Sequence, residues 1–294
     1  MNNESRKLPR RPLSELNVID DFLFTELMND PRHRIELSEL LISTFLGRKI
    51  TVREVHTQKA SGGMGTEEHG IRMDAYIEPL PNGEEKAVVY DMEMETREAD
   101  KESLPRRNRY YSALLDAHLL ATGMDYDSLP DLLTIVVLSY DPFSEGRMIY
   151  EAKSAIVGRP EISYADGIRR LYFYTDRELD EDLGEYGRSL KNLLRYVRNS
   201  RSENAVDDTT KRIDSFVRDT KARKEVSVEF MKRWELDKII REEGRQEGRE
   251  EGEEDLNSLY RWLLDNDRLE DLRRSTEDKA FREQLKEEME AEAR

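Results

Sequence analysis

The sequence predicts an α/β protein, with a mixed sheet flanked by helices and a helical C-terminal extension. Strict alternation of apolar and polar residues in 71–78 and 86–96 is typical of strands with one buried face. The β-branched run DLLTIVVLSYD at 131–141 is typical of a central strand. After residue 178, apolar residues recur at three- and four-residue spacing among many charges, which predicts helices.

The N-terminal region predicts helices over residues 13–45. Apolar residues recur with helical spacing in DDFLFTELM and in RHRIELSELLISTFLG, Pro31 interrupts the pattern, and Gly47 is expected to end it. A strand is expected over residues 50–58. The glycine-rich stretch SGGMGTEEHG that follows is expected to be a flexible loop.

Residues 71–78 and 86–96 are expected to pair as a hairpin across the sequence PNG. If Asn82 and Gly83 form a two-residue turn, Asp74 lies directly opposite Asp91 and diagonal to Glu93. Side chains two positions apart on a strand point to the same face. The sequence therefore predicts that Asp91, Glu93 and Glu95 share one surface with Asp74.

Ser103 is expected to cap a helix that runs to about residue 121. Its predicted buried stripe consists of Tyr111, Leu114, Leu115, His118 and Leu119. With the strand at 131–141, the element order becomes helix, three strands, helix, strand. Two short strands are expected at 148–157 and 169–176. The next helix has an apolar face of Leu190, Leu193, Leu194 and Val197.

Glycine recurs every fourth residue in REEGRQEGREEGEE, at Gly244, Gly248 and Gly252. Spacing of four keeps these residues on one helix face, which would permit close approach of a second helix, including that of a second copy. A charged linker is the alternative. A homodimer formed through this C-terminal tail is therefore one expectation.

Composition restricts the class of function. The 294 residues include no cysteine, which excludes disulfides and zinc–thiolate sites. The net charge of −16 argues against coating nucleic acid by charge alone, although an enzyme that acts on nucleic acid needs only a local basic rim. The longest apolar run, near 132–138, is too short to span a membrane, and the basic N-terminus lacks the apolar core of a secretion signal. We expect a soluble cytoplasmic protein without a membrane partner.

The acidic residues between positions 74 and 95 indicate a metal-binding site. Like charges this close are unfavourable without a cation, and carboxylate oxygens are the ligands that Mg²⁺ prefers. A divalent ion can activate water and relieve charge on a phosphate, so metal-assisted hydrolysis is expected, with Asp74, Asp91 and Glu93 as ligands. The alternative is a solvated strand edge in a structural interaction protein.

An Asp on one strand, a Glu on the next and a polar residue two positions later resembles the site of PD-(D/E)XK nucleases. Here the pattern reads Asp74, Glu93 and Glu95. Five further blocks, in order from residue 13 to 254, resemble one bacterial family of recombination-promoting nucleases, also described as PD-(D/E)XK transposases. They are IDDFLFTELM, YDMEMET, LPRRNRYYSALLD, YDPFSEGRMIY and EEGRQEGREEG.

The resemblance implies a restriction-endonuclease-like α-β-β-β-α-β core at 13–178, a helical extension at 179–240, the glycine-spaced segment at 241–255 and a C-terminal helical segment at 256–294. It also implies a DNA endonuclease that uses Mg²⁺ or Mn²⁺ and promotes recombination, with Asp74 and Glu93 as ligands. Phosphate contacts are expected from Arg106, Arg107, Arg109 and Tyr110.

One position departs from the family. Glu95 stands where these nucleases carry Lys or, in this family, Gln. A carboxylate cannot stabilise negative charge as Lys does, but it can serve as a further ligand or a general base. The alternative function is a catalytically inactive DNA-binding or assembly protein that keeps the nuclease fold.

Overall fold

The computed structural model describes residues 11–57, 75–79, 87–120, 125–178 and 183–292. The chain divides into two compact units between Ser227 and Val228. The predicted loop at 61–70 and the proposed ligand Asp74 lie outside the described residues.

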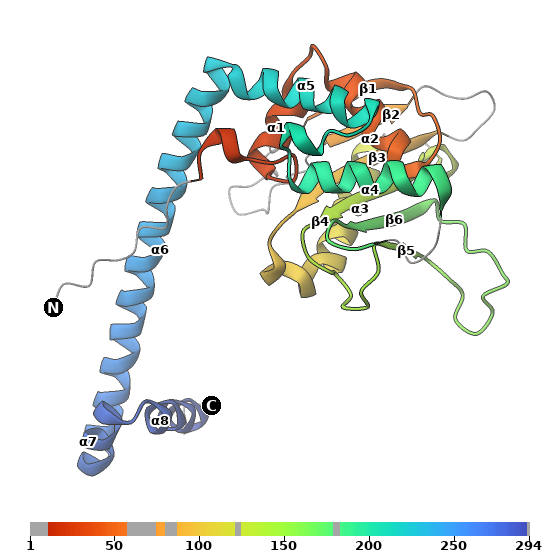
Figure 1. The fold of residues 1–294 in the computed structure, drawn as a ribbon. Coiled ribbons are helices and arrows are strands. Elements are labelled where there is room, and N and C mark those ends of the chain that lie inside the picture. Colours follow the sequence, from red (N-terminus) through yellow and green to blue (C-terminus); the bar gives the residue numbers. More distant parts are fainter. Residues whose placement is uncertain (1–10, 58–74, 80–86, 121–124, 179–182, 293–294) are drawn as a thin grey trace. The chain divides into compact units, whose positions relative to one another are not determined.

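The first unit contains the mixed sheet that the sequence predicts (Figure 1). Its strands are β1 (Val52–His56), β2 (Ala75–Pro79), β3 (Val88–Glu95), β4 (Asp131–Leu138), β5 (Ile149–Lys153) and β6 (Ile168–Tyr174). They lie in the order β1-β2-β3-β4-β6-β5. The central strands β3, β4 and β6 are parallel, and the outer pairings are antiparallel.

Helices flank this sheet as expected. They are α1 (Asp21–Asn29), α2 (Arg34–Leu46), α3 (Leu104–Leu119), α4 (Gly184–Arg198) and α5 (Asp208–Ala222), with short 3-10 helices η1 (Leu13–Glu15), η2 (Glu98–Ser103), η3 (Tyr126–Ser128) and η4 (Ser202–Asn204). The predicted interruption at Pro31 is confirmed, because it falls between α1 and α2. Gly47 ends α2 with φ +63°, a conformation that glycine adopts without strain.

The two faces of the sheet are covered by different helices. On one face, Leu115 of α3 packs against Val89 and Leu132. On the other face, the ring of Phe45 from α2 lies 4.7 Å from the ring of Phe173 on β6. Because Val89 lies two positions before Asp91 on β3, α3 lies over the strand face that carries the β3 acids.

The buried side of α3 differs from the predicted stripe. Its buried residues are Leu104, Asn108, Ser112 and Leu115, whereas His118 is exposed and Tyr111 is only half-buried. Ser103 precedes the helix as expected, but its hydroxyl donates to the Asp100 carbonyl instead of capping α3. The prediction missed this face because it assumed an apolar stripe, whereas α3 places polar side chains against the sheet.

The predicted apolar face at 190–197 is confirmed, since all four of its residues are buried in α4. The glycine-spaced segment is helical, because α6 (Lys224–Asp265) continues through it. The second unit also contains α7 (Leu269–Glu277) and α8 (Lys279–Glu292). Its core is formed by Leu259, Leu263 and Leu285.

Candidate functional site

Three acids of β3 lie on the sheet face beneath α3. Asp91 and Glu95 are buried, and Glu93 between them is partly accessible. In the parallel register with β4, Asp91 is beside Thr134, Glu93 beside Val136 and Glu95 beside Leu138. A row of carboxylates in an otherwise apolar layer is costly unless each is protonated or compensated by a positive charge. The environment of each acid therefore defines what it can do.

The hairpin register differs by two residues from the one expected for a two-residue turn at Asn82 and Gly83. Tyr76, and not Asp74, is paired with Asp91, and Ile77 is paired with Tyr90. A shift of two keeps every side chain on its expected face, so the alternation in the sequence is satisfied equally well by both registers. Ile77 and Tyr90 are both buried on the opposite face of the sheet, where side-chain packing can favour one register over the other.

Asp91 is the most deeply buried acid of the row. Its Oδ1 atom makes no hydrogen bond with any residue that the structure describes. Burial raises the pKa of Asp91 from its ordinary 3.8 to about 7, although the Thr134 hydroxyl and the positive charge of Arg170 act in the opposite direction. Asp91 can therefore hold a proton near neutral pH when no cation is bound beside it.

This burial predicts a pH-dependent cost. Because the folded pKa lies above the unfolded one, the folded protein binds the extra proton, and stability falls as pH rises from about 4 to about 7. Asp91→Asn removes this titration. Between pH 5 and pH 8 in EDTA, we therefore expect the decrease in the free energy of unfolding to be roughly 3 kcal/mol smaller in the variant than in the native protein. Urea unfolding at both pH values measures this. The exposed control Asp127→Asn should keep the native pH dependence, and an unchanged dependence in Asp91→Asn would contradict the assignment.

Glu95 is compensated by a cation from α3. Its Oε1 accepts a hydrogen bond of 2.7 Å from the backbone N–H of Arg97, and its Oε2 forms an ion pair with Arg107. Burial acts to lower the pKa of Arg107, but the hydrogen bond and charge of Glu95 outweigh it, and the pKa is raised. Glu93 contributes to the same rise, so the guanidinium lies within the electrostatic reach of both acids.

The four residues expected to contact DNA phosphates fall into two groups. Arg106, Arg109 and Tyr110 are exposed on α3. Arg107 is only 23% exposed and is engaged with Glu95. The structure therefore separates Arg107 from the others: it belongs to the acid row, whereas the exposed three belong to the outer surface of the helix.

Polar side chains between α3 and the sheet were missed by the sequence analysis. Arg170 of β6 donates to the Ser112 hydroxyl at 3.0 Å, and Asn108 donates to the Tyr172 hydroxyl at 3.2 Å. Arg170 also influences Asp91 electrostatically. Thr134 and Arg170 could have indicated this polar layer in the sequence, because each interrupts an apolar strand segment. Together these residues form a polar layer that places positive charge near Asp91.

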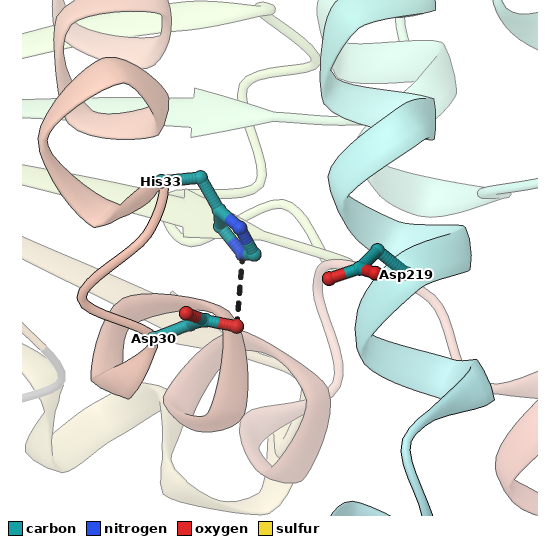
Figure 2. Close-up of side chains that lie close together, drawn as sticks. All are labelled: Asp30, His33 and Asp219. Atoms are coloured by element: carbon teal, nitrogen blue, oxygen red, sulfur yellow. Dashed lines mark ion pairs between the residues drawn. The ribbon is translucent and has the colours of Figure 1, made fainter.

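A second titratable cluster joins the helices on the other side of the unit. Asp30 follows α1, His33 precedes α2 and Asp219 lies on α5, and their ligand atoms all lie within 4.8 Å of one another (Figure 2). Within the described part of the chain it is the only such group of three, and the β3 acids do not form one. The sequence gives no sign of this cluster, because its four histidines are scattered without metal-ligand spacing.

Arginines already compensate this cluster. The buried Asp30 carboxylate forms ion pairs with Arg32, at 2.6 Å, and with Arg223. Arg32 also forms an ion pair with Asp219, at 2.5 Å. These arginines leave the carboxylates little excess negative charge for a cation. Burial lowers the pKa of His33, whose ring stacks on Phe216 with centroids 4.6 Å apart. The arrangement is that of an ion-pair network linking α1, α2 and α5.

The first unit thus belongs to the class of mixed α/β proteins, with a row of acids enclosed between the central sheet and one covering helix. No family model, curated protein or solved structure matches this chain. Among the described residues, no helix combines the length and apolar character needed to cross a membrane.

Proposed function

We propose that the chain is a metal-dependent DNA endonuclease with a restriction-endonuclease-like core that promotes recombination. The observation that carries the proposal is the enclosed acid row of β3, in which the partly accessible Glu93 lies between the buried Asp91 and the arginine-paired Glu95. The element order from α1 to β4 is compatible with the core that the family resemblance implies. Asp74, on the segment before β2, is the proposed partner of Glu93.

The donor atoms suit a hard divalent cation. The unpartnered, buried Oδ1 of Asp91 is a carboxylate oxygen that a cation could satisfy, and carboxylates are preferred by Mg²⁺ and Mn²⁺. Asp74 and Glu93 would hold the ion, with Asp91 as a further ligand. When bound, the ion would supply an activated water and relieve charge on the scissile phosphate.

Arg107 can compensate for the absence of Lys at position 95. Glu95 fixes this guanidinium beside the acid row, and its charge also reaches Glu93. An arginine can stabilise negative charge on a phosphate through two parallel hydrogen bonds. We therefore assign Glu95 the role of positioning Arg107, and Arg107 the role of stabilising negative charge on the phosphate. The exposed Arg106, Arg109 and Tyr110 would contact the flanking DNA backbone.

The alternative, an inactive DNA-binding protein with the same fold, is favoured by one observation. Both oxygens of Glu95 are already engaged, by Arg97 N–H and by Arg107, so this carboxylate is not available as a ligand or a base without losing those contacts. The two functions differ in whether bound DNA is cut.

Nicking and linearisation of supercoiled plasmid in MgCl₂, MnCl₂ or EDTA tests the proposal. We expect cutting in either metal, none in EDTA and none by Asp74→Ala, because that carboxylate is a proposed ligand. Cutting that Asp74→Ala retains would refute the assignment. DNA retention without cutting in either metal would favour the inactive alternative. If Glu95→Gln or Glu95→Lys then cut, the chain would be a disabled nuclease.

A further inference from the structure

A large basic cavity lies in the first unit, away from the β3 acids. Its volume is about 1080 Å³, at the upper end of cavities that enclose small ligands. The walls come from the N-terminal segment, the segment before β5, the chain after β6, the second half of α4, the segment following it and α5. None of the described lining residues belongs to β3 or α3, so this cavity is distinct from the proposed nuclease site.

Positive charge dominates the lining. Seven basic and three acidic side chains line the cavity, although the whole chain carries a net charge of −16. Two of the acids are already paired, Asp176 with Arg198 and Glu178 with Lys191. Among the described residues, Arg177 and Arg195 have no ion-pair partner, and both are exposed. The cavity therefore has an excess of positive charge that its own acids do not neutralise.

Lys221 lies where an anion would relieve unfavourable charge, whereas Arg11 is paired with Asp20 and Arg201 with Glu203, two acids outside the cavity lining. Lys221 donates a hydrogen bond of 3.1 Å to the Ser14 carbonyl. Burial lowers the pKa of Lys221, Asp20 opposes this, and the positive charge of Arg11 lowers it further. Crowding of like charges in a partly buried place is costly, and a bound anion would reduce that cost.

The lining chemistry favours phosphate over a base or an apolar group. Arginine forms paired hydrogen bonds with phosphate oxygens, and five of the seven basic residues are arginines. No aromatic side chain occurs among the described lining residues, so the stacking platforms typical of base recognition are missing there. Cations converge from several segments around one concave space, which suits closely spaced phosphates rather than an isolated charge.

We propose that this basic cavity binds a ligand with several adjacent phosphate groups, held mainly by Arg177, Arg195 and Lys221. The same chemistry could come from a free oligophosphate or from consecutive backbone phosphates of a nucleic-acid strand. The compact, concave shape favours the free oligophosphate. The site is independent of the acid row and requires no hydrolysis.

Isothermal titration of the full chain with inorganic tripolyphosphate, in EDTA, tests the site. We expect saturable binding that weakens with added salt and weakens at least about tenfold in the double variant Arg177→Gln/Arg195→Gln. The matched control Arg188→Gln/Arg273→Gln removes two exposed arginines outside the cavity and should bind as the native chain does. Because all four residues are exposed, urea unfolding should show unchanged stability in both variants.

Absence of tripolyphosphate binding, or equal weakening in the two double variants, would overturn the proposal. A single-stranded oligonucleotide distinguishes the two sources of phosphate. If it displaces tripolyphosphate and loses affinity in the cavity variant, the site binds the backbone of a strand. If it does not displace tripolyphosphate, the site binds a free oligophosphate. Since EDTA prevents metal-dependent cutting, failure of the nuclease proposal would leave this result unaffected.

Discussion

Glu93→Gln is expected to lower Mg²⁺-dependent plasmid cleavage at least about 100-fold. The amide keeps the size of the side chain but removes the negative charge of the only partly accessible acid among the three of the β3 row. Even residues that only support metal ligands typically cost 10–100-fold when mutated, so loss of a proposed ligand should cost more. Initial rates of nicking, measured over a range of MgCl₂ concentrations, would reveal the loss and show whether added metal restores cleavage.

The matched control for this experiment is Glu98→Gln, which removes one exposed acid from η2, just after β3. It should retain near-native cleavage. If the two variants cut equally well, Glu93 is not a ligand and the acid row has another purpose. Urea unfolding of both variants separates a chemical loss from a structural one, because substitution of the partly accessible Glu93 should leave the fold intact.

Asp30→Asn is expected to destabilise the first unit by about 3 kcal/mol at pH 7. The Asp30 side chain is 1% exposed and accepts hydrogen bonds from Arg32 and Arg223, so the neutral amide removes both ion pairs and places N–H donors in a buried position that faces two guanidinium groups. The hydrogen bond with Arg32 is the main cause that holds the pKa of Asp30 well below its ordinary range. Its stabilisation is therefore present at neutral pH and is lost as pH falls through the acidic range.

Asp219→Asn provides the comparison from the same cluster. Asp219 is 49% exposed and pairs with the exposed Arg32, and such pairs contribute less than about 1 kcal/mol. Urea unfolding at pH 7 should therefore rank Asp30→Asn far below Asp219→Asn in stability. Equal losses would mean that the cluster acts as one unit in which burial of the carboxylate is unimportant, contrary to the ion-pair network described above.

Local features of the fold were predictable because they depend on neighbouring residues. The helix end at Gly47 and the apolar face of α4 follow from backbone conformation and helical spacing, and both are confirmed. The β4 strand was recognisable because its β-branched run is buried along nearly its whole length. The stripe of α3 was not predictable from apolar spacing, because polar residues such as Asn108 and Ser112 face the sheet.

Sequence alone also assigned the β3 acids to one strand face, because alternation has a period of two and needs no partner. It could not fix the hairpin register, since a shift of two residues preserves every face. Nor could it pair Glu95 with Arg107, or Asp30 with Arg223, 193 positions away. The reason is physical: periodicity fixes the direction of a side chain, whereas burial and compensating charge depend on which distant segments pack against it.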